Sequence, residues 1–365
     1  MQPAGRCYQF GAILAAITLV VLVVVLAMLL RAAFSGIRPG LKAEIGSTAF
    51  FGGAADARQE LNKDVAGSIS METRSLLEKA PEPRLLFGGI RRYPETKKRV
   101  TKFLRSKMPQ ATSESSIRLV SSGASDFEIL RGLRELLLHA AAQVRAKPAT
   151  STPVVRGREK SRLEDIEAEI AMFGARVTPN FGYLDVGSSE GKITGALASA
   201  LALAKTQAFA CDLIEPATKD DRFTFVRNTA SKLPFDDAAF DVITMFMSAH
   251  HFSNVEAMLD ECKRVARPGA LVLIREHDCG SPAAGAFYDI VHALYACVLG
   301  SEATPEDFLA QYASGTYACY RPRTEWIKLF AAHGFALSDK IPPHASRFGV
   351  DSFDSFYALF EKVGK

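Results

Sequence analysis

The sequence lacks the cysteine patterns of a metal-clustered or disulfide-linked protein. Its 365 residues include six cysteines, and no two of them form a Cys-x-x-Cys pair or another paired spacing. Such spacings mark zinc sites and disulfide frameworks. We therefore predict no metal site and no disulfides, and the pattern indicates a reducing compartment.

Only one long hydrophobic run is present. Phe10–Leu30 contains 21 residues without a charge and is bounded by Arg6 and Arg31. About 20 apolar residues cross a bilayer as a helix, whereas the apolar core of a signal peptide is usually about 7–15 residues long. We predict that residues 1–31 are an N-terminal transmembrane anchor and that the protein crosses the membrane once.

The charges that flank this run predict its orientation. Arg6 and the α-amino group precede it, and Arg31, Arg38 and Lys42 follow it. Because positive charge concentrates on the cytoplasmic side of a membrane, the C-terminal bulk is expected in the cytosol.

The net charge of +4 is unevenly distributed, since residues 1–160 carry +12 and the remainder carries −8. The densest basic run is Arg91–Lys107, which suits anionic lipid headgroups, nucleic acid or plain solvation. Gly, Pro and Ser/Thr interrupt residues 32–160, so this segment is predicted to be a basic, partly helical or disordered stalk that is poorly suited to a core. Within it, apolar residues near 3.6 spacing predict a helix over 126–145, and Lys147–Lys160 is predicted to be a linker.

From residue 161 onward, short apolar runs alternate with amphipathic helical patterns. This alternation predicts parallel strands with crossover helices on both faces. The expected strands are Phe181–Val186, Ala208–Leu213, Thr224–Arg227, Phe240–Met245 and Ala270–Arg275, with closing antiparallel strands at Phe335–Ile341 and Phe353–Phe360. The expected helices include Leu163–Phe173, Lys192–Ala204, Val255–Ala266 and Trp326–Gly334.

A glycine turn at Gly187–Gly191 follows the first strand and opens a helix, so it presents free backbone N–H groups. A dinucleotide-binding G-x-G-x-x-G fits poorly, because the third glycine comes one position early. A nucleophile elbow, G-x-S-x-G with Ser189 attacking, matches literally, but the preceding hundred residues lack the strands and oxyanion loop that it needs. A nucleoside-binding turn fits better, with Asp212 placed 27 residues after Asp185 at the tip of the next strand to accept from ribose hydroxyls.

Four sequence blocks, in order, resemble class I S-adenosylmethionine-dependent methyltransferases of the type-11 group, over about residues 160–365. They are Leu184–Gly191, Cys211-Asp212, Leu233–Ile243 continued by Ser248–Phe252, and Glu261–Gly269. The resemblance implies a Rossmann-like, doubly wound, seven-stranded, mostly parallel sheet that binds S-adenosyl-L-methionine. It implies cofactor contacts by Asp185, Gly187, Ser189, Gly191, Asp212, Leu213, Thr229, Ala230 and Met247. Ser189 and Thr229 replace a glycine and an aspartate that are usual in the family.

Two polar clusters follow the fourth and fifth strands, at the edge where such sheets bind ligands. They are His250-His251 and Glu276-His277-Asp278. Histidine suits proton abstraction near neutral pH, and His250 and His251 are the predicted catalytic residues because the family has a histidine pair there. Residues 280–321 add an apolar, tyrosine-bearing helix, which is either core or a lid over an apolar or aromatic substrate.

We therefore predict a membrane-anchored methyltransferase for a small-molecule or lipid-like acceptor, with the anchor at 1–31, the stalk at 32–160 and the catalytic domain at 161–365. Alternatives are a nucleic-acid or cap methyltransferase that binds phosphate through Arg91–Lys107, a non-catalytic scaffold with a degenerate cofactor fold, and a serine hydrolase acting through Ser189.

Overall fold

The computed structural model describes residues 85–145, 158–216, 218–229, 232–299, 303–315, 317–347 and 354–364. All of them belong to one compact unit that begins at Phe50. The predicted anchor at 10–30 and the first half of the predicted stalk lie outside the described residues.

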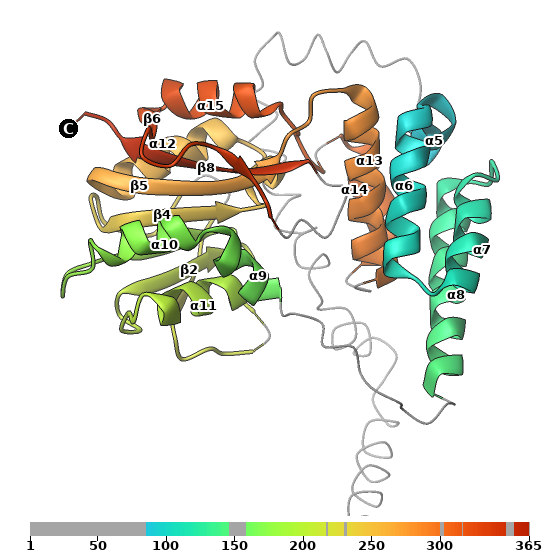
Figure 1. Cartoon of the computed structure of the whole chain (residues 1–365), viewed down its shortest axis with the longest axis horizontal. Coiled ribbons are helices and arrows are strands. Elements are labelled where there is room, and N and C mark those ends of the chain that lie inside the picture. The colour runs from blue at the N-terminus through green and yellow to red at the C-terminus, as the bar shows by residue number, and fades with distance from the viewer. Residues whose placement is uncertain are drawn as a thin grey trace, which may run out of the picture. The chain divides into compact units, whose positions relative to one another are not determined.

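A mixed sheet forms one half of the described protein (Figure 1). Seven strands follow the order β3-β2-β1-β4-β5-β8-β6, and the two-residue β7 also pairs with β8. The pairs among β1 to β5 are parallel, whereas β8 is antiparallel to β5, β6 and β7. The strands are β1 (Tyr183–Val186), β2 (Ala208–Asp212), β3 (Thr224–Arg227), β4 (Phe240–Phe246), β5 (Ala266–His277), β6 (Phe335–Leu337), β7 (His344–Ala345) and β8 (Ser355–Lys362). The predicted Rossmann-like sheet is confirmed.

Helices cover both faces of this sheet. Successive strand residues point to opposite sides, and the apolar ones on each side are buried by a different set of helices. Tyr183 packs in the cluster of α10 (Glu167–Gly174) and α11 (Lys192–Ala200). Leu184 packs in the cluster of α12 (Val255–Val265) and α15 (Arg323–Ala332). The single helix predicted over 163–173 is two helices, since α9 (Arg158–Asp165) ends before Ile166, which has a non-helical backbone.

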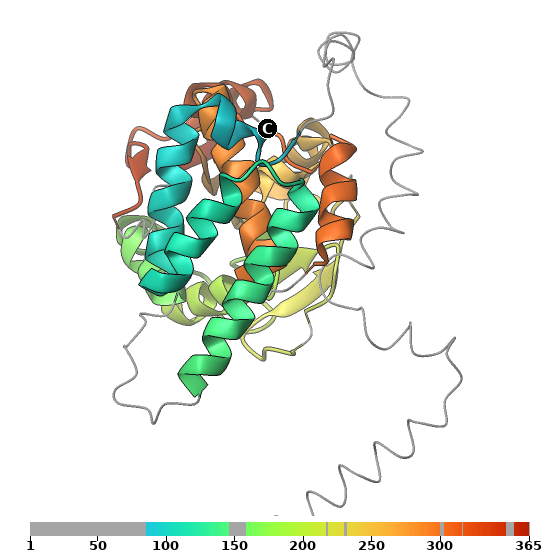
Figure 2. The same cartoon turned by 90° about the vertical axis from the view of Figure 1, so that its right-hand side faces the viewer.

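A second, all-helical layer lies beside the sheet (Figure 2). It contains α5 (Gly88–Arg92), α6 (Pro94–Lys107), α7 (Gln110–Val120), α8 (Asp126–Arg145), α13 (Pro282–Ala293), the π-helix η2 (Leu294–Leu299) and α14 (Pro305–Ala313). The predicted helix over 126–145 is confirmed as α8.

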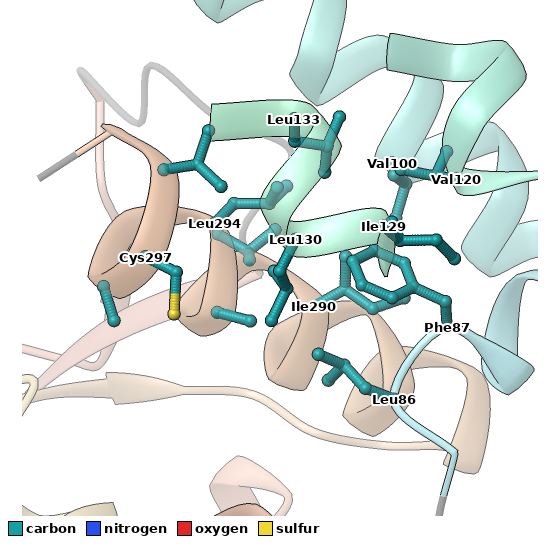
Figure 3. Close-up of a cluster of buried hydrophobic side chains, with 14 of the residues drawn as sticks. Leu86, Phe87, Val100, Val120, Ile129, Leu130, Leu133, Ile290, Leu294 and Cys297 are labelled. Carbon is teal, nitrogen blue, oxygen red and sulfur yellow. The ribbon is translucent and has the colours of Figure 1, made fainter. Parts of the chain in front are cut away.

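The prediction that residues 32–160 are poorly suited to a core is wrong for 86–133. Leu86, Phe87, Val100, Leu130 and Leu133 are buried in one cluster with residues of α13 and η2 (Figure 3). Each of α5 to α7 has too few apolar residues for a core of its own. α5 and α6 bury those residues against α13, which lies more than 150 positions later in the chain, and α7 packs against α6 and α8. Sequence periodicity cannot report such a distant partner.

Polar contacts fix this layer to itself and to the sheet-bearing part of the chain. The Asp126 carboxylate accepts from the backbone N–H groups of Leu86 (2.6 Å) and Phe87 (3.0 Å). Thr96 Oγ1 donates to the Ala283 carbonyl at 2.8 Å across 187 residues of sequence. The N-terminal helices are therefore bonded to α13 as well as packed on it.

Among the described residues, one helical stretch, 282–299, is long and apolar enough to span a membrane by composition. It is α13 with η2, and the cluster that it forms with α6 and α8 buries Phe287, Ile290, Val291 and Leu294. Its apolar character is therefore explained by the core.

Candidate functional site

The glycine turn connects β1 to α11 and adopts a conformation that requires glycine. Gly187 and Gly191 have φ of +73° and +69°. A Cβ at Gly187 would lie 2.4 Å from Ser248 Cβ, and one at Gly191 would lie 2.2 Å from the Phe223 ring. Positive φ and this crowding together exclude a side chain at either position.

Asp212 lies directly against this turn, at the carboxyl end of β2. Its carboxylate accepts from Ser189 N–H at 2.8 Å and from Leu213 N–H at 2.7 Å. The structure therefore brings together the first-strand turn and the second-strand carboxylate, as the spacing predicted.

Ser189 does not have the surroundings of a nucleophile. Its φ is +53° and its N–H is directed at Asp212. Within the described part of the chain, no histidine forms a hydrogen bond with its hydroxyl. The G-x-S-x-G match therefore reflects the turn geometry, and the serine hydrolase alternative has no triad here.

Asp185 is buried beneath the turn. Its two carboxylate oxygens accept from the hydroxyls of Thr194 on α11 (2.5 Å) and Thr244 on β4 (2.7 Å). Burial raises the pKa of Asp185 from 3.8 to about 6, although the two threonine hydroxyls act in the opposite direction. This carboxylate joins the first strand to the helix that follows the turn.

Replacing Asp185 with asparagine should flatten part of the pH dependence of stability. Because the folded pKa is raised above its unfolded value, Asp185 contributes stability below about pH 3.8 that is lost as the pH rises through about 6. Relative to Asp185→Asn, the parent should lose about 2–3 kcal/mol of unfolding free energy from about pH 4 to about pH 7. Denaturant unfolding across this range measures it, and parallel curves for the two proteins would contradict the assignment.

The other predicted cofactor residues lie along the same edge. Leu213 and Met247 are half-buried, and Met247 has φ +59° with its N–H donating to the Arg275 carbonyl at 2.7 Å. Thr229 is exposed and forms a β-bridge with Lys232. Ala230 lies outside the described residues.

The two predicted catalytic histidines have different surroundings in the short helix η1 (Ala249–His251). His250 is buried, with Nδ1 2.6 Å from Glu276 Oε2 and Nε2 3.3 Å from His292 Nε2. His251 is half-buried, and its Nδ1 lies 3.0 Å from the Tyr317 carbonyl oxygen. A carbonyl only accepts, so Nδ1 of His251 carries the proton and Nε2 is the basic nitrogen.

Burial favours the uncharged forms of the groups around His250. It lowers the pKa of His250 to about 3, with the Arg275 charge adding to the effect, and it lowers that of His292 to about 3. It raises the pKa of Glu276 to about 8, against three backbone N–H donors. Imidazoles here are neutral at physiological pH.

Sequence reasoning missed His292, which lies on α13 among apolar neighbours. Its Nδ1 faces the Tyr288 carbonyl oxygen at 2.8 Å and the Tyr320 hydroxyl at 3.0 Å. The rings of Tyr288 and His277 stack with centroids 4.2 Å apart. The sequence gives one signal for this residue, a single histidine within the apolar helix of residues 280–321. That helix is predicted to be core or a lid, so its histidine was not among the candidate site residues.

The family-like sequence blocks after β3 and on α12 support the fold. The Arg264 guanidinium donates to Glu261, to the Leu233 and Phe235 carbonyls and to Asp237. Leu233 N–H donates to Glu261 at 2.9 Å. These contacts fix the loop before β4 against the end of α12.

A separate groove of about 610 Å³ opens at the amino ends of β1, β2 and β4. It is the edge opposite to the glycine turn, so it is not part of this site. It is lined by residues such as Phe181, Gln207, Phe235 and Arg267.

Known proteins resemble this chain over the turn and its neighbouring strands. Residues 184–274 match the model of a family described as a methyltransferase domain. The demethylmenaquinone methyltransferase of Clavibacter sepedonicus is 33% identical over 97 residues, which is 26% of this chain and 40% of that protein. The ubiquinone/menaquinone biosynthesis C-methyltransferase UbiE of Burkholderia vietnamiensis is 31% identical over 111 residues, 28% of this chain and 45% of that protein.

Among solved structures, the 1,6-didemethyltoxoflavin-N1-methyltransferase of Burkholderia thailandensis aligns with a TM-score of 0.39 and 16% identity, covering 66% of this chain and 92% of that one. The chain spans less than half the length of the two relatives compared by sequence.

Proposed function

Since residues 184–274 form a class I S-adenosylmethionine-dependent methyltransferase domain, we propose that this protein transfers a methyl group from S-adenosylmethionine to a small-molecule acceptor. One observation carries the proposal: the Asp212 carboxylate at the tip of β2 lies 2.8 Å from an amide of the glycine turn. A carboxylate beside backbone donors is the arrangement that binds the ribose of a nucleoside at this edge of a doubly wound sheet.

The residues present fit the cofactor. Asp212 would accept from the ribose hydroxyls, and the turn from Gly187 to Gly191 would meet the methionine end. Leu213, Thr229-Ala230 and Met247 would border the adenine. Asp185 would act through Thr194 and Thr244, which hold the turn in place. The bound cofactor supplies an electrophilic methyl group on a sulfonium.

We place the acceptor beyond β4 and β5, under the helical layer. Rings of His251, His292, Tyr317 and Tyr320 gather there, with centroid separations of 5.2–5.8 Å for the pairs that include His292. Such rings suit a flat, unsaturated acceptor. The relatives' names include demethylmenaquinone and didemethyltoxoflavin methyltransferases, and a ring compound of that class is the acceptor that we propose here.

Methyl transfer needs the acceptor held in line with the sulfonium, and a base only where the acceptor must lose a proton. His251 is the better placed of the two predicted catalytic histidines, because it is half-buried and its basic Nε2 is the nitrogen that does not face Tyr317.

Replacing His251 with alanine should lower kcat by about 100-fold or more, as expected for loss of a general base, and leave the dissociation constant for S-adenosylmethionine unchanged. His333→Ala, which removes a histidine that follows α15 and pairs with Asp260 on α12, is the matched control. Single-turnover rates and calorimetry measure the two quantities, and wild-type turnover in His251→Ala would remove the assignment.

The direct test uses the full chain in lipid with methyl-labelled S-adenosylmethionine and an extract of small molecules. Labelled product of low molecular mass supports the proposal. Absence of cofactor binding at millimolar concentration would instead indicate a non-catalytic scaffold.

We also propose that the chain is tethered to a membrane through residues 10–30, with the catalytic domain in the cytosol. The support is the uncharged 21-residue run together with exposed basic side chains of α5 and α6. Arg91 and Arg92 at the end of α5 are exposed, as are Lys97, Lys98, Lys102 and Arg105 on α6, whereas Val100, Phe103 and Leu104 on the other face of α6 are buried. A tether would keep the site close to an acceptor that dissolves in the bilayer.

Replacing Lys97, Lys98 and Lys102 with glutamine should weaken binding of residues 50–365 to vesicles rich in phosphatidylserine. Each cation near an anionic surface contributes about 1 kcal/mol, so three removals should cost on the order of 100-fold. Flotation with anionic and neutral vesicles measures the effect. Equal binding of parent and variant to anionic vesicles would show that α6 does not face the headgroups.

A further inference from the structure

Three histidines from three elements converge beside the proposed acceptor site. His250 lies in η1, His277 ends β5 and His292 lies on α13. One ring nitrogen from each lies within 4.8 Å of the others. We propose that these three imidazoles bind one divalent transition-metal ion, with Zn²⁺ as the best match.

The hydrogen bonds around the cluster leave the inner nitrogens as acceptors. His292 Nδ1 faces the Tyr288 carbonyl at 2.8 Å, and because a carbonyl only accepts, Nδ1 carries the proton. His250 Nδ1 faces Glu276 Oε2 at 2.6 Å; when Nε2 of His250 binds a cation, Nδ1 carries the proton and donates it to the Glu276 carboxylate. Both Nε2 atoms are then free of protons and can share one ion.

The separation of these two nitrogens fits a shared cation. His250 Nε2 and His292 Nε2 are 3.3 Å apart. Two lone pairs at that distance repel, whereas two nitrogens bound to one tetrahedral Zn²⁺ at about 2.0–2.1 Å lie about 3.3–3.4 Å apart. A bound cation removes this repulsion, and the competing arrangement is a proton held on one of the two nitrogens.

The outer contacts are also those of metal-binding histidines. Such residues usually donate their second ring N–H to a carboxylate or a backbone carbonyl, which fixes the tautomer. Glu276 does this for His250, and the Tyr288 carbonyl does it for His292. Glu276 is itself held by the N–H groups of Ala249 (2.8 Å) and His277 (3.2 Å).

Donor chemistry selects the type of ion. Neutral imidazoles suit Zn²⁺, Cu²⁺, Ni²⁺ and Fe²⁺, whereas Mg²⁺ and Ca²⁺ require oxygen ligands. The Glu276 carboxylate behind His250 would offset one of the two positive charges of the ion, and the nearby Arg275 guanidinium donates to Ser355 Oγ (2.8 Å). A three-histidine set also leaves one coordination position for water or a substrate oxygen.

The test is metal binding by the full chain after chelator treatment, with Co²⁺ or Zn²⁺ alone as the probe. We expect one equivalent per chain, a tetrahedral Co²⁺ visible spectrum without a thiolate charge-transfer band, and displacement of Co²⁺ by Zn²⁺. His292→Gln should lower Zn²⁺ affinity by about 100-fold or more, and Glu276→Gln by about 10–100-fold. His333→Gln, outside the cluster, should bind as the parent does.

Circular dichroism of each metal-free variant verifies folding, and His277→Gln replaces any variant that fails this check. No saturable binding, or a Co²⁺ spectrum that persists in His292→Gln, would overturn the proposal. That result would assign the cluster to a proton-sharing chain in which a protonated Glu276 donates through His250 to His292. Methyl transfer is not measured, so the result is independent of the proposed activity.

Discussion

Replacing Asp212 with alanine is expected to lower the affinity for S-adenosylmethionine by about 1,000-fold. Hydrogen bonds to a charged group are worth about 1.5–3 kcal/mol each, and a ribose offers two hydroxyl donors. Losing both costs about 4 kcal/mol, which is about three decades in the dissociation constant. Isothermal titration calorimetry measures the change directly.

The structure also supplies the controls for this prediction. Asp212→Asn keeps the side-chain shape and one acceptor oxygen, so it should have an intermediate affinity. Asp221→Ala removes an acid whose side chain is fully exposed and paired with Lys205, and it should bind as the parent does. Parental affinity in Asp212→Ala would show that the carboxyl end of β2 is not the nucleoside site.

Replacing Leu133 with alanine is expected to destabilise the whole described unit, because the side chain is completely buried in the cluster that α8 forms with α13 and η2. Truncating a buried leucine costs about 2–5 kcal/mol. Leu138 on the same helix is 62% exposed, so Leu138→Ala should change stability by less than about 0.5 kcal/mol. Denaturant unfolding of the pair measures the difference.

The only tryptophan makes this experiment a test of cooperativity. Trp326 is completely buried on one face of the sheet, in the cluster of α12 and α15, and not in the cluster of the helical layer. If the helical layer and the sheet unfold as one unit, Leu133→Ala should lower the midpoint reported by Trp326 fluorescence. A Trp326 transition that stays in place, while helical circular dichroism is lost earlier, would show two independent folding units.

These two predictions rest on different kinds of information. The sequence alone predicts that Asp212 ends the second strand near the glycine turn, because its spacing from Asp185 matches one strand–helix–strand unit. The turn between them has glycines at two positions that need positive φ. The sequence also predicts the helix that contains Leu133, but it does not predict which helices bury that side chain. Residues 32–160 have no apolar pattern strong enough for a separate core, so the sequence favours a stalk there.

The sequence by itself determined the sheet, its helices and the cofactor edge. Strand alternation, helical periodicity and glycine conformation depend on neighbours a few positions away, so these features can be read locally. Tertiary structure alone decided that α5 and α6 pack on α13, that α8 packs on η2, and that His292 meets His250, which in turn meets Glu276. Those contacts join residues tens to hundreds of positions apart. The burial of these side chains and the protonation of the histidines depend on every element that packs around them.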